Sequence, residues 1–374
     1  MDGSVTFRTV VPADHEAARE LYRRHYWRPH CLLLDEPFYD WQIRQPPLSR
    51  QRGGDQSVVA VDAQGRLLAH LALFPEVVWD HGRDRTGLHL ISWLADPQVR
   101  GVGLGSAMID HVKGLSDLLV GRSLSAPSRA AFMKQQFRYL TRCQRWLGVL
   151  HAPACLPLLI EPPEQAAKVL QRREWPRGQP RPYRTGPHPP SGAETLARQV
   201  LRGSVAFART QEYLTWRYTH HPRLHYDFLW LGDAARPHAW AVTRTETIGG
   251  RPGKALRILE FLAPDEAAVD LAHALADWGR QQGCAFMDQF GLSERLLAGF
   301  VAAGAWNTLE EPELRLPTLL SPWDPNDAPP GILLYSRPEP GTGIALTDNV
   351  ADFYLSKGDG NMDWPSWAAV AQAA

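Results

Sequence analysis

Apolar residues along the first 150 positions follow two different periods. Between residues 14 and 25 they recur at Ala17, Ala18, Leu21 and Tyr22, which is helical spacing. Two apolar runs flank the turn sequence Asp62-Ala63-Gln64-Gly65, which indicates a hairpin. The pattern predicts strands over residues 5–11, 57–61, 67–74, 88–95, 117–120 and 145–151, and helices over 14–25, 36–45, 128–139 and from a glycine-rich loop to about residue 113.

Prolines then interrupt the pattern, because residues 153–190 hold ten of the 31 in the chain. Proline fixes φ and lacks a backbone donor, so this stretch is expected to be a connector without a sheet or a long helix. After it the alternation restarts. We expect strands over residues 238–245, 255–262 and 285–289, and helices over 265–282 and 293–303.

Two matched blocks indicate that the restart is an internal repeat. Asp40-Trp41 is followed by Pro47, and Thr215-Trp216 is followed by Pro222 at an offset of 175. Residues 88–95 match residues 256–263 at an offset of 168. A duplicated fold is therefore predicted, with an N-terminal domain over 1–152, a proline-rich connector over 153–200, a C-terminal copy over 201–340 and a tail over 341–374.

Composition narrows the function classes. A length of 374 residues exceeds one ordinary core and favours two domains. Lys plus Arg and Asp plus Glu number 40 each, and this balance argues against a dedicated nucleic-acid binder. No apolar run reaches 18 residues and no signal segment is recognised, so we expect a cytoplasmic protein without a membrane span. The four cysteines have no metal-ligand spacing and are expected to be free thiols, with no metal bound.

The chemistry-bearing motif is the sequence Gln98-Val99-Arg100-Gly101-Val102-Gly103-Leu104-Gly105-Ser106, between a predicted strand and a helix. Glycines allow close backbone approach, and the first N–H groups of a helix have no internal partners. With the helix dipole, they favour a phosphate. The matching stretch of the second copy, Pro264-Asp265-Glu266-Ala267-Ala268, has lost the glycines and carries two acids, so it cannot hold phosphates.

This motif and the order of the elements resemble the GCN5-related N-acetyltransferases, whose signature is Gln/Arg-x-x-Gly-x-Gly/Ala. The resemblance covers residues 4–152, and residues 205–315 are similar to the same fold with an emptied loop. It implies a mixed α/β (α+β) fold in which each of two tandem domains has a mostly antiparallel central sheet flanked by helices. It also implies acyl-CoA as co-substrate, held by a splayed strand and the loop. The residues placed there are Leu94, Ala95, Gln98, Val99, Arg100, Gly101, Val102, Gly103, Leu104, Gly105 and Ser106.

A narrower resemblance involves residues 213–218 with His221-Pro222, and the tail sequence over 353–363. These look like tandem-domain bacterial acyltransferases of polysaccharide loci, some of which acylate nucleotide-linked amino sugars. The expected reaction is direct transfer of an acetyl or longer acyl group to a primary amine. The expected acceptor is an amino sugar, free or nucleotide-linked. A homodimer is left open.

Acyl transfer needs a neutral amine, a donor to the oxyanion and a departing thiolate. The resemblance places the oxyanion donor near Trp93, Leu94 or Ala95. His89 is the first candidate base, against the alternative of a strand histidine satisfied by a neighbour. Ser92 would face away from His89 on an ideal strand, unless a bulge turns it. Glu260 and Asp288 are further candidates to act as base or bind the amine, against the alternative of ordinary ion pairs.

Trp216, Arg217 and Tyr218 are candidate substrate residues, although Trp41 at the matched position favours a core role for Trp216. Asp359 and Asp363 could reach the cleft as charge partners of the amine. One departure from the family concerns the proton donor to sulfur: Phe132 stands where the family often has tyrosine, which leaves Tyr139 or water for that role.

Two other functions remain open on sequence. One is acylation of an amino acid, peptide or antibiotic amine, including relatives of the aminoacyl-tRNA-dependent peptidoglycan enzymes. The neutral charge and the glycine loop argue against tRNA. The other is an inactive CoA-binding scaffold, which the missing tyrosine keeps open.

Overall fold

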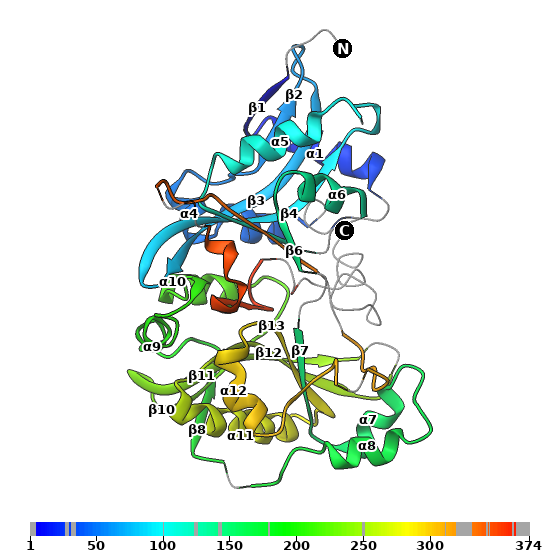
Figure 1. Ribbon diagram of the computed structural model, residues 1–374, viewed down its shortest axis with the longest axis vertical. Helices are drawn as coiled ribbons and strands as arrows, with labels where there is room; N and C mark the ends of the chain where they lie inside the picture. Colours follow the sequence, from blue (N-terminus) through cyan, green and yellow to red (C-terminus); the bar gives the residue numbers. More distant parts are fainter. Residues whose placement is uncertain are drawn as a thin grey trace.

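The computed structural model describes residues 5–26, 30, 35–99, 101–122, 126–140, 144–178, 180–248, 251–310, 312–318, 331–341, 343, 345–360 and 363. Two halves lie one above the other, with α9, α10 and the C-terminal segment between them (Figure 1). The elements of the first half are β1 (Thr6–Thr9), α1 (Asp14–His25), α3 (Glu36–Tyr39), the π-helical turn η1 (Asp40–Arg44), α4 (Pro47–Gln51), β2 (Val58–Val61), β3 (Leu67–Asp80), β4 (Arg83–Ala95), α5 (Leu104–Lys113), β5 (Leu118–Arg122), α6 (Ala126–Lys134), β6 (Arg138–Leu140) and β7 (Gln144–Val149).

The remaining elements begin with the short helices α7 (Ala152–Cys155) and α8 (Ala166–Arg172). There follow β8 (Tyr183–Gly186), α9 (Ala193–Val200), β9 (Val205–Phe207), α10 (Gln211–Leu214), the π-helical turn η4 (Thr215–Thr219), β10 (Asp227–Asp233), β11 (Arg236–Thr247), β12 (Lys254–Leu262), α11 (Asp265–Gln281), β13 (Phe286–Leu292), α12 (Glu294–Ala302), β14 (Trp306–Asn307), β15 (Ile332–Ser336) and β16 (Phe353–Ser356).

The structure corrects three sequence expectations. The hairpin strands β3 and β4 continue to a tight turn at His81 and Gly82, both with positive φ, so they are much longer than predicted. The helix expected over 128–139 ends at Lys134, and β6 follows it. The proline-rich stretch contains β8, which pairs with β10 at the edge of the sheet. An edge position tolerates neighbouring prolines because one side needs no donors.

The described strands form one continuous mixed sheet in the order β6-β15-β5-β4-β3-β9-β16-β13-β12-β11-β10-β8, with the other strands branching from it. In each half a central strand pairs in parallel with the next. Gly87 to Leu90 of β4 pair with Leu118 to Gly121, and Ala255 to Ile258 of β12 pair with Phe286 to Gln289. Adding 168 to each residue number of the β4–β5 pairing gives the β12–β13 pairing.

The two halves also exchange a strand. β7, which directly follows β6, pairs with β13 and β14 (β7 and β13 lie together in the lower half of Figure 1). β15, from the end of the chain, instead lies between β5 and β6. Each half is therefore completed by a strand from the other.

A pair of tryptophans joins the halves at their matched positions. Trp41 donates from Nε1 to the carbonyl of Trp216 at 2.9 Å, and Trp216 donates to the carbonyl of Trp41 at 2.8 Å. Their rings stack at 5.4 Å. Both lie in single π-helical turns, which is the local geometry that the matched sequence blocks share.

Candidate active site

The glycine loop has the geometry of an open helix N-terminus. Gly101 and Gly103 both have φ of 83°, which favours glycine, and a Cβ on either would meet no atom within 4 Å. Gly103 is the N-cap of α5, and no side chain caps that helix. Val102 is 59% exposed. The first amides of α5 are therefore available to an anion. Arg100 lies outside the described residues.

The start of the loop is held by Asp96, whose carboxylate accepts from the backbone N–H of Gln98 at 2.9 Å. Its own N–H donates to the carbonyl of Leu68. Gly105 packs against the ring of Trp93, because a Cβ there would lie 3.0 Å from ring carbons. The expected loop residues thus lie together between the end of β4 and α5.

Beyond Leu90 the strands β4 and β5 no longer pair. Leu90 and Ser92 of β4 face Leu73 and Ala72 of β3, so Ile91 is an extra, bulged residue. The segment from Ser92 to Ala95 is partly exposed, whereas the paired part of β4 is buried from Gly87 to Ile91. Among the described residues, no strand pairs with Ser92 to Ala95 on the side of β5, so this edge of β4 is open there beside the glycine loop.

The second half has the same bulge but a filled gap. Leu259 is the extra residue of β12, 168 positions after Ile91. Here β16 pairs with the end of β13. The Tyr354 hydroxyl accepts from the backbone N–H of Phe261 at 3.2 Å and donates to Glu260 at 2.7 Å. The chain's own C-terminal segment thus occupies the place that stays open in the first half.

The position of Phe261 in β12 corresponds to that of Trp93 in β4. Phe261 pairs with Ala241 and Trp93 pairs with Leu71, in matching registers. Since the N–H of Phe261 points into its gap and meets an oxygen, we expect the N–H of Trp93 to point into the open gap.

Glu260 and Asp288 are fully buried in ion pairs. Glu260 accepts from Arg209 at 3.1 and 3.2 Å and from the hydroxyls of Tyr218 and Tyr354. Asp288 accepts from Arg145 at 2.9 Å and Arg257 at 2.6 Å. These contacts match the ion-pair alternative for both carboxylates.

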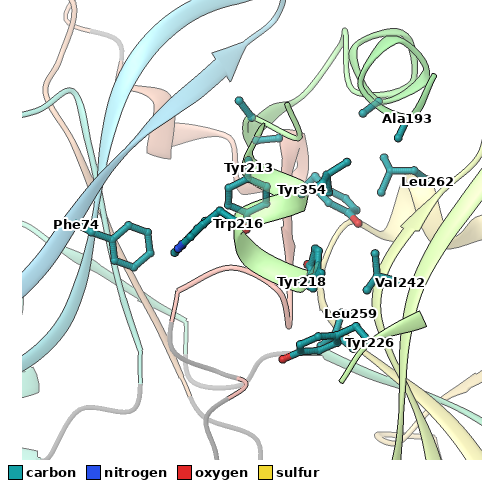
Figure 2. Packing of buried hydrophobic residues seen from close by; sticks show 14 of the residues in the cluster. Phe74, Ala193, Tyr213, Trp216, Tyr218, Tyr226, Val242, Leu259, Leu262 and Tyr354 are labelled. Atoms are coloured by element: carbon teal, nitrogen blue, oxygen red, sulfur yellow. The ribbon is translucent and has the colours of Figure 1, made fainter. Parts of the chain in front are cut away.

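The candidate substrate residues face the chain's own C-terminal segment. Trp216 lies in the main core between Phe74 and Tyr213 (Figure 2). Arg217 is 1% exposed and donates to the carbonyls of Gly358 at 2.7 Å and Gly360 at 3.4 Å. Tyr218 donates to Glu260. Gly358 leaves no space for a side chain, because a Cβ would overlap the Tyr218 hydroxyl.

Asp359 and Asp363 are equally enclosed. Asp359 accepts a hydrogen bond from Arg209 at 2.8 Å. Burial raises the pKa of Asp359, but the Arg209 guanidinium outweighs burial and holds this pKa below its usual value. Asp363 pairs with Arg244 at 2.7 Å and Lys357 at 3.2 Å. Despite burial, these cations hold the pKa of Asp363 well below its usual range.

His89 points into the same interior. Its Nε2 lies 2.9 Å from Glu76 Oε2, and its ring is enclosed by Phe207 at 3.8 Å and Phe74 at 4.6 Å. The side chain is 1% exposed. Burial lowers the pKa of His89 to about 3 and raises the pKa of Glu76 well above its usual value.

Phe132 packs edge-on against Trp93 at 5.4 Å, so an apolar ring lies beside Trp93 at the position where the sequence resemblance implies a tyrosine. Tyr139 lies on β6, where Arg129 is 5.1 Å above its ring.

Sequence reasoning missed one polar cluster beside the open edge. Tyr22 donates to Ser92 Oγ at 2.8 Å, and His30 Nε2 lies 3.2 Å from the same oxygen. The His70 ring is 5.9 Å from that of Tyr22. Tyr22 entered the helical pattern as an apolar position, and no local signal links residues 22, 30, 70 and 92.

Two searches of the described residues return negative findings. No set of three or more histidine, cysteine or acidic side chains in that part of the chain is arranged to hold a metal ion. Within the same residues, every helix is too short or too polar to cross a bilayer.

With β4 splayed and bulged beside the glycine loop and α5, the chain has a fold similar to that of solved GCN5-related N-acetyltransferases. Solved structures share it at low sequence identity. A GCN5-related N-acetyltransferase from Anabaena variabilis is 10% identical with a TM-score of 0.55, over 88% of this chain and 72% of that one. A second, from Kribbella flavida, is 11% identical with a TM-score of 0.56, over 90% and 71%.

The N-myristoyltransferase of Saccharomyces cerevisiae, solved with bound myristoyl-CoA, is also similar in fold. It is 8% identical with a TM-score of 0.53, over 94% of this chain and 89% of that one. No family model matches the sequence, and no curated protein matches it.

Proposed function

We propose that this protein is an acyl-CoA-dependent N-acyltransferase, built from two tandem copies of the fold, of which only the first takes the thioester. The observation that carries this is the open α5 N-terminus beside the open edge of β4. The second copy has acids at the start of α11 and Tyr354 in the gap. The fold neighbour with myristoyl-CoA supports an acyl-CoA ligand.

The loop from Gln98 to Ser106 would bind the pyrophosphate through backbone amides. Leu94 and Ala95 would lie along the pantetheine, and the N–H of Trp93 would stabilise the oxyanion. The amine attacks directly, since no cysteine lies in the motif. We propose an amino sugar, free or nucleotide-linked, as acceptor on the basis of the tail and residues 213–218. These segments would support the acceptor side indirectly, since Arg217 and Tyr218 anchor the tail.

The test is calorimetric titration with acetyl-CoA and longer acyl-CoAs, followed by mass spectrometry of products from a panel of amines. We expect binding and acylation of amino sugars. Absence of acyl-CoA binding would refute the proposal. Binding without acylation of any amine would favour a scaffold, and acylation of amino acids or peptides alone would replace the acceptor class.

A further inference from the structure

The open edge of β4 carries a hydroxyl that is joined to buried proton acceptors. Because Ile91 is bulged, Ser92 lies on the face of the sheet that α1 covers. Ser92 is partly exposed, whereas Tyr22 and His30 are 2% and 3% exposed. The cluster therefore reaches from the accessible edge into the interior.

The hydrogen bonds of this cluster have a direction. The Tyr22 hydroxyl donates to Ser92 Oγ at 2.8 Å, which leaves the Ser92 proton free to point at His30 Nε2, 3.2 Å away. Burial lowers the pKa of His30 to about 3, with a smaller contribution from His70, so the imidazole is neutral at pH 7 and its Nε2 can accept the Ser92 hydrogen bond. Burial also raises the pKa of Tyr22, which keeps it a donor.

A second buried imidazole faces the cluster from β3. His70 is 0% exposed, and neither ring nitrogen has a hydrogen-bond partner among the described residues. Burial lowers the pKa of His70 to about 4. The charges of Asp55 and Asp14 raise this pKa and that of His15 lowers it, each by less than burial does. The Tyr26 ring meets His30 edge-on at 4.6 Å. No carboxylate is hydrogen-bonded to Ser92, Tyr22 or His70 in the described part of the chain.

The other histidine of β4 is less accessible. His89 lies below the bulge, is hydrogen-bonded to Glu76 and is covered by Phe74 and Phe207. Ser92 is therefore the more accessible of the two side chains, because it is partly exposed whereas the His89 side chain is 1% exposed.

We propose that Ser92 meets the acceptor amine and passes its proton to His30, with Tyr22 as a positioning residue. This inference rests on the proposed acyltransferase function. It assigns the proton acceptor to His30, which follows α1 in the sequence, rather than to His89.

The step balances as follows. The amine nitrogen bonds to the thioester carbon, and the N–H proton moves to Ser92 Oγ while the Ser92 proton moves to His30 Nε2. The C–S bond then breaks, its electron pair leaves with sulfur, and His30 returns the proton to the thiolate through Ser92 or to water. Once the new bond forms, the nitrogen is positively charged and releases its proton readily, so a weakly basic acceptor suffices.

The experiment compares two nucleophiles with acetyl-CoA, at pH values from 6 to 9. Glucosamine, or the best acceptor of the panel, is the more basic nucleophile, so the positively charged nitrogen formed in its attack needs the relay to remove the proton. Hydroxylamine is much less basic, and the more acidic nitrogen formed in its attack loses its proton to water without the relay. We expect Ser92→Ala and His30→Gln to lower kcat on the first nucleophile by about 10² to 10⁴-fold and to alter its pH profile. Both variants should keep activity on hydroxylamine and affinity for acetyl-CoA.

Ser92→Thr should restore activity, because it returns the hydroxyl. Tyr22→Phe should lower kcat by about tenfold with little change in KM. His220→Gln, at an exposed turn, is the matched control. If His30→Gln folds poorly, His30→Asn replaces it, with thermal melting as the check.

Two outcomes overturn the relay: unchanged kcat and pH profile in both Ser92→Ala and His30→Gln, or equal losses on both nucleophiles. Failure of the unaltered protein to acylate any amine would instead overturn the proposed function, and the relay with it. The two failures are thereby distinguishable.

Discussion

At the residue scale, a comparison of Gly103 with Gly65 distinguishes a role in ligand binding from a role in stability. It and Gly65 both have φ near +80° and open space around a Cβ, but only Gly103 lies in the loop. We expect Gly103→Ala and Gly65→Ala to cost about 1 kcal/mol each through backbone strain. Only Gly103→Ala should weaken acetyl-CoA binding, by about tenfold, or 1.4 kcal/mol.

Calorimetry and denaturant titration of the two variants measure both effects. Equal acetyl-CoA affinities would show that the loop backbone does not bind the co-substrate.

Single residues also show where sequence reasoning stopped. The glycines were identified because a motif of nine adjacent residues carries its own backbone geometry. The partners of Asp288 could not be, since Arg145 and Arg257 lie 143 and 31 positions away. The position of His89 nine residues before Gln98, and the expected place of Glu260 and Asp288 on strands beside the interdomain cleft, give no information on their partners. In the structure each of the three has a buried partner.

At the element scale, the matched helices α5 and α11 differ in their first turns. That of α5 has no acidic residue, whereas that of α11 carries Asp265 and Glu266. We expect Ser106→Asp to stabilise α5 by about 0.3–1 kcal/mol, because an anion favours the helix N-terminus. The same charge should repel the pyrophosphate and weaken acetyl-CoA binding by about tenfold at low salt.

Ser106→Asn is the neutral control for this change. The measurement is acetyl-CoA affinity at two salt concentrations, together with the melting temperature. If Ser106→Asp raised both the acetyl-CoA affinity and the melting temperature, or lowered both, a phosphate site at α5 would be contradicted.

The strands show a different limit of sequence reasoning. Strand segments such as β2 and β12 were recognised from their apolar runs. The strand with which β7 pairs could not be predicted, because the apolar pattern of β7 is equally compatible with pairing to β5 and to β13. The bulges at Ile91 and Leu259 were also invisible, since they depend on pairing with β3 and β11.

At the scale of the whole molecule, the exchanged strands make the halves interdependent. A fragment of residues 1–152 lacks β15 and leaves β7 without β13. An unpaired strand edge favours aggregation, so we expect this fragment to be insoluble or unfolded. Co-expression with residues 153–374 should restore a soluble complex that binds acetyl-CoA.

Size-exclusion chromatography and circular dichroism report the result. A monomeric fragment with native-like secondary structure and full acetyl-CoA affinity would contradict the interdependence.

Buried histidines predict how stability depends on pH. Burial lowers the pKa of His30, His70, His89 and His221. Between about pH 6.5 and 4 the unfolded chain binds these protons and the folded protein does not, so stability falls as pH falls, by up to about 1.4 kcal/mol per pH unit for each histidine. Buried Glu76 and Glu260, with raised pKa values, act in the opposite sense and offset part of this.

We therefore expect denaturant midpoints to decrease from pH 7 to pH 5. His221→Asn should reduce the change of the free energy of unfolding with pH by the contribution of one proton. A stability that rises between pH 7 and pH 5 would contradict the neutral state of these histidines.

The sequence by itself determined the glycine loop, the helix that follows it and the loss of that loop in the second copy. Each of these depends on neighbouring residues, whose φ preferences and unpaired amides act locally. Only the tertiary structure decided which charged groups remain accessible, which half receives β7 and what fills the second gap. Those outcomes depend on burial and on partners that lie tens to hundreds of positions away, and no short pattern encodes them.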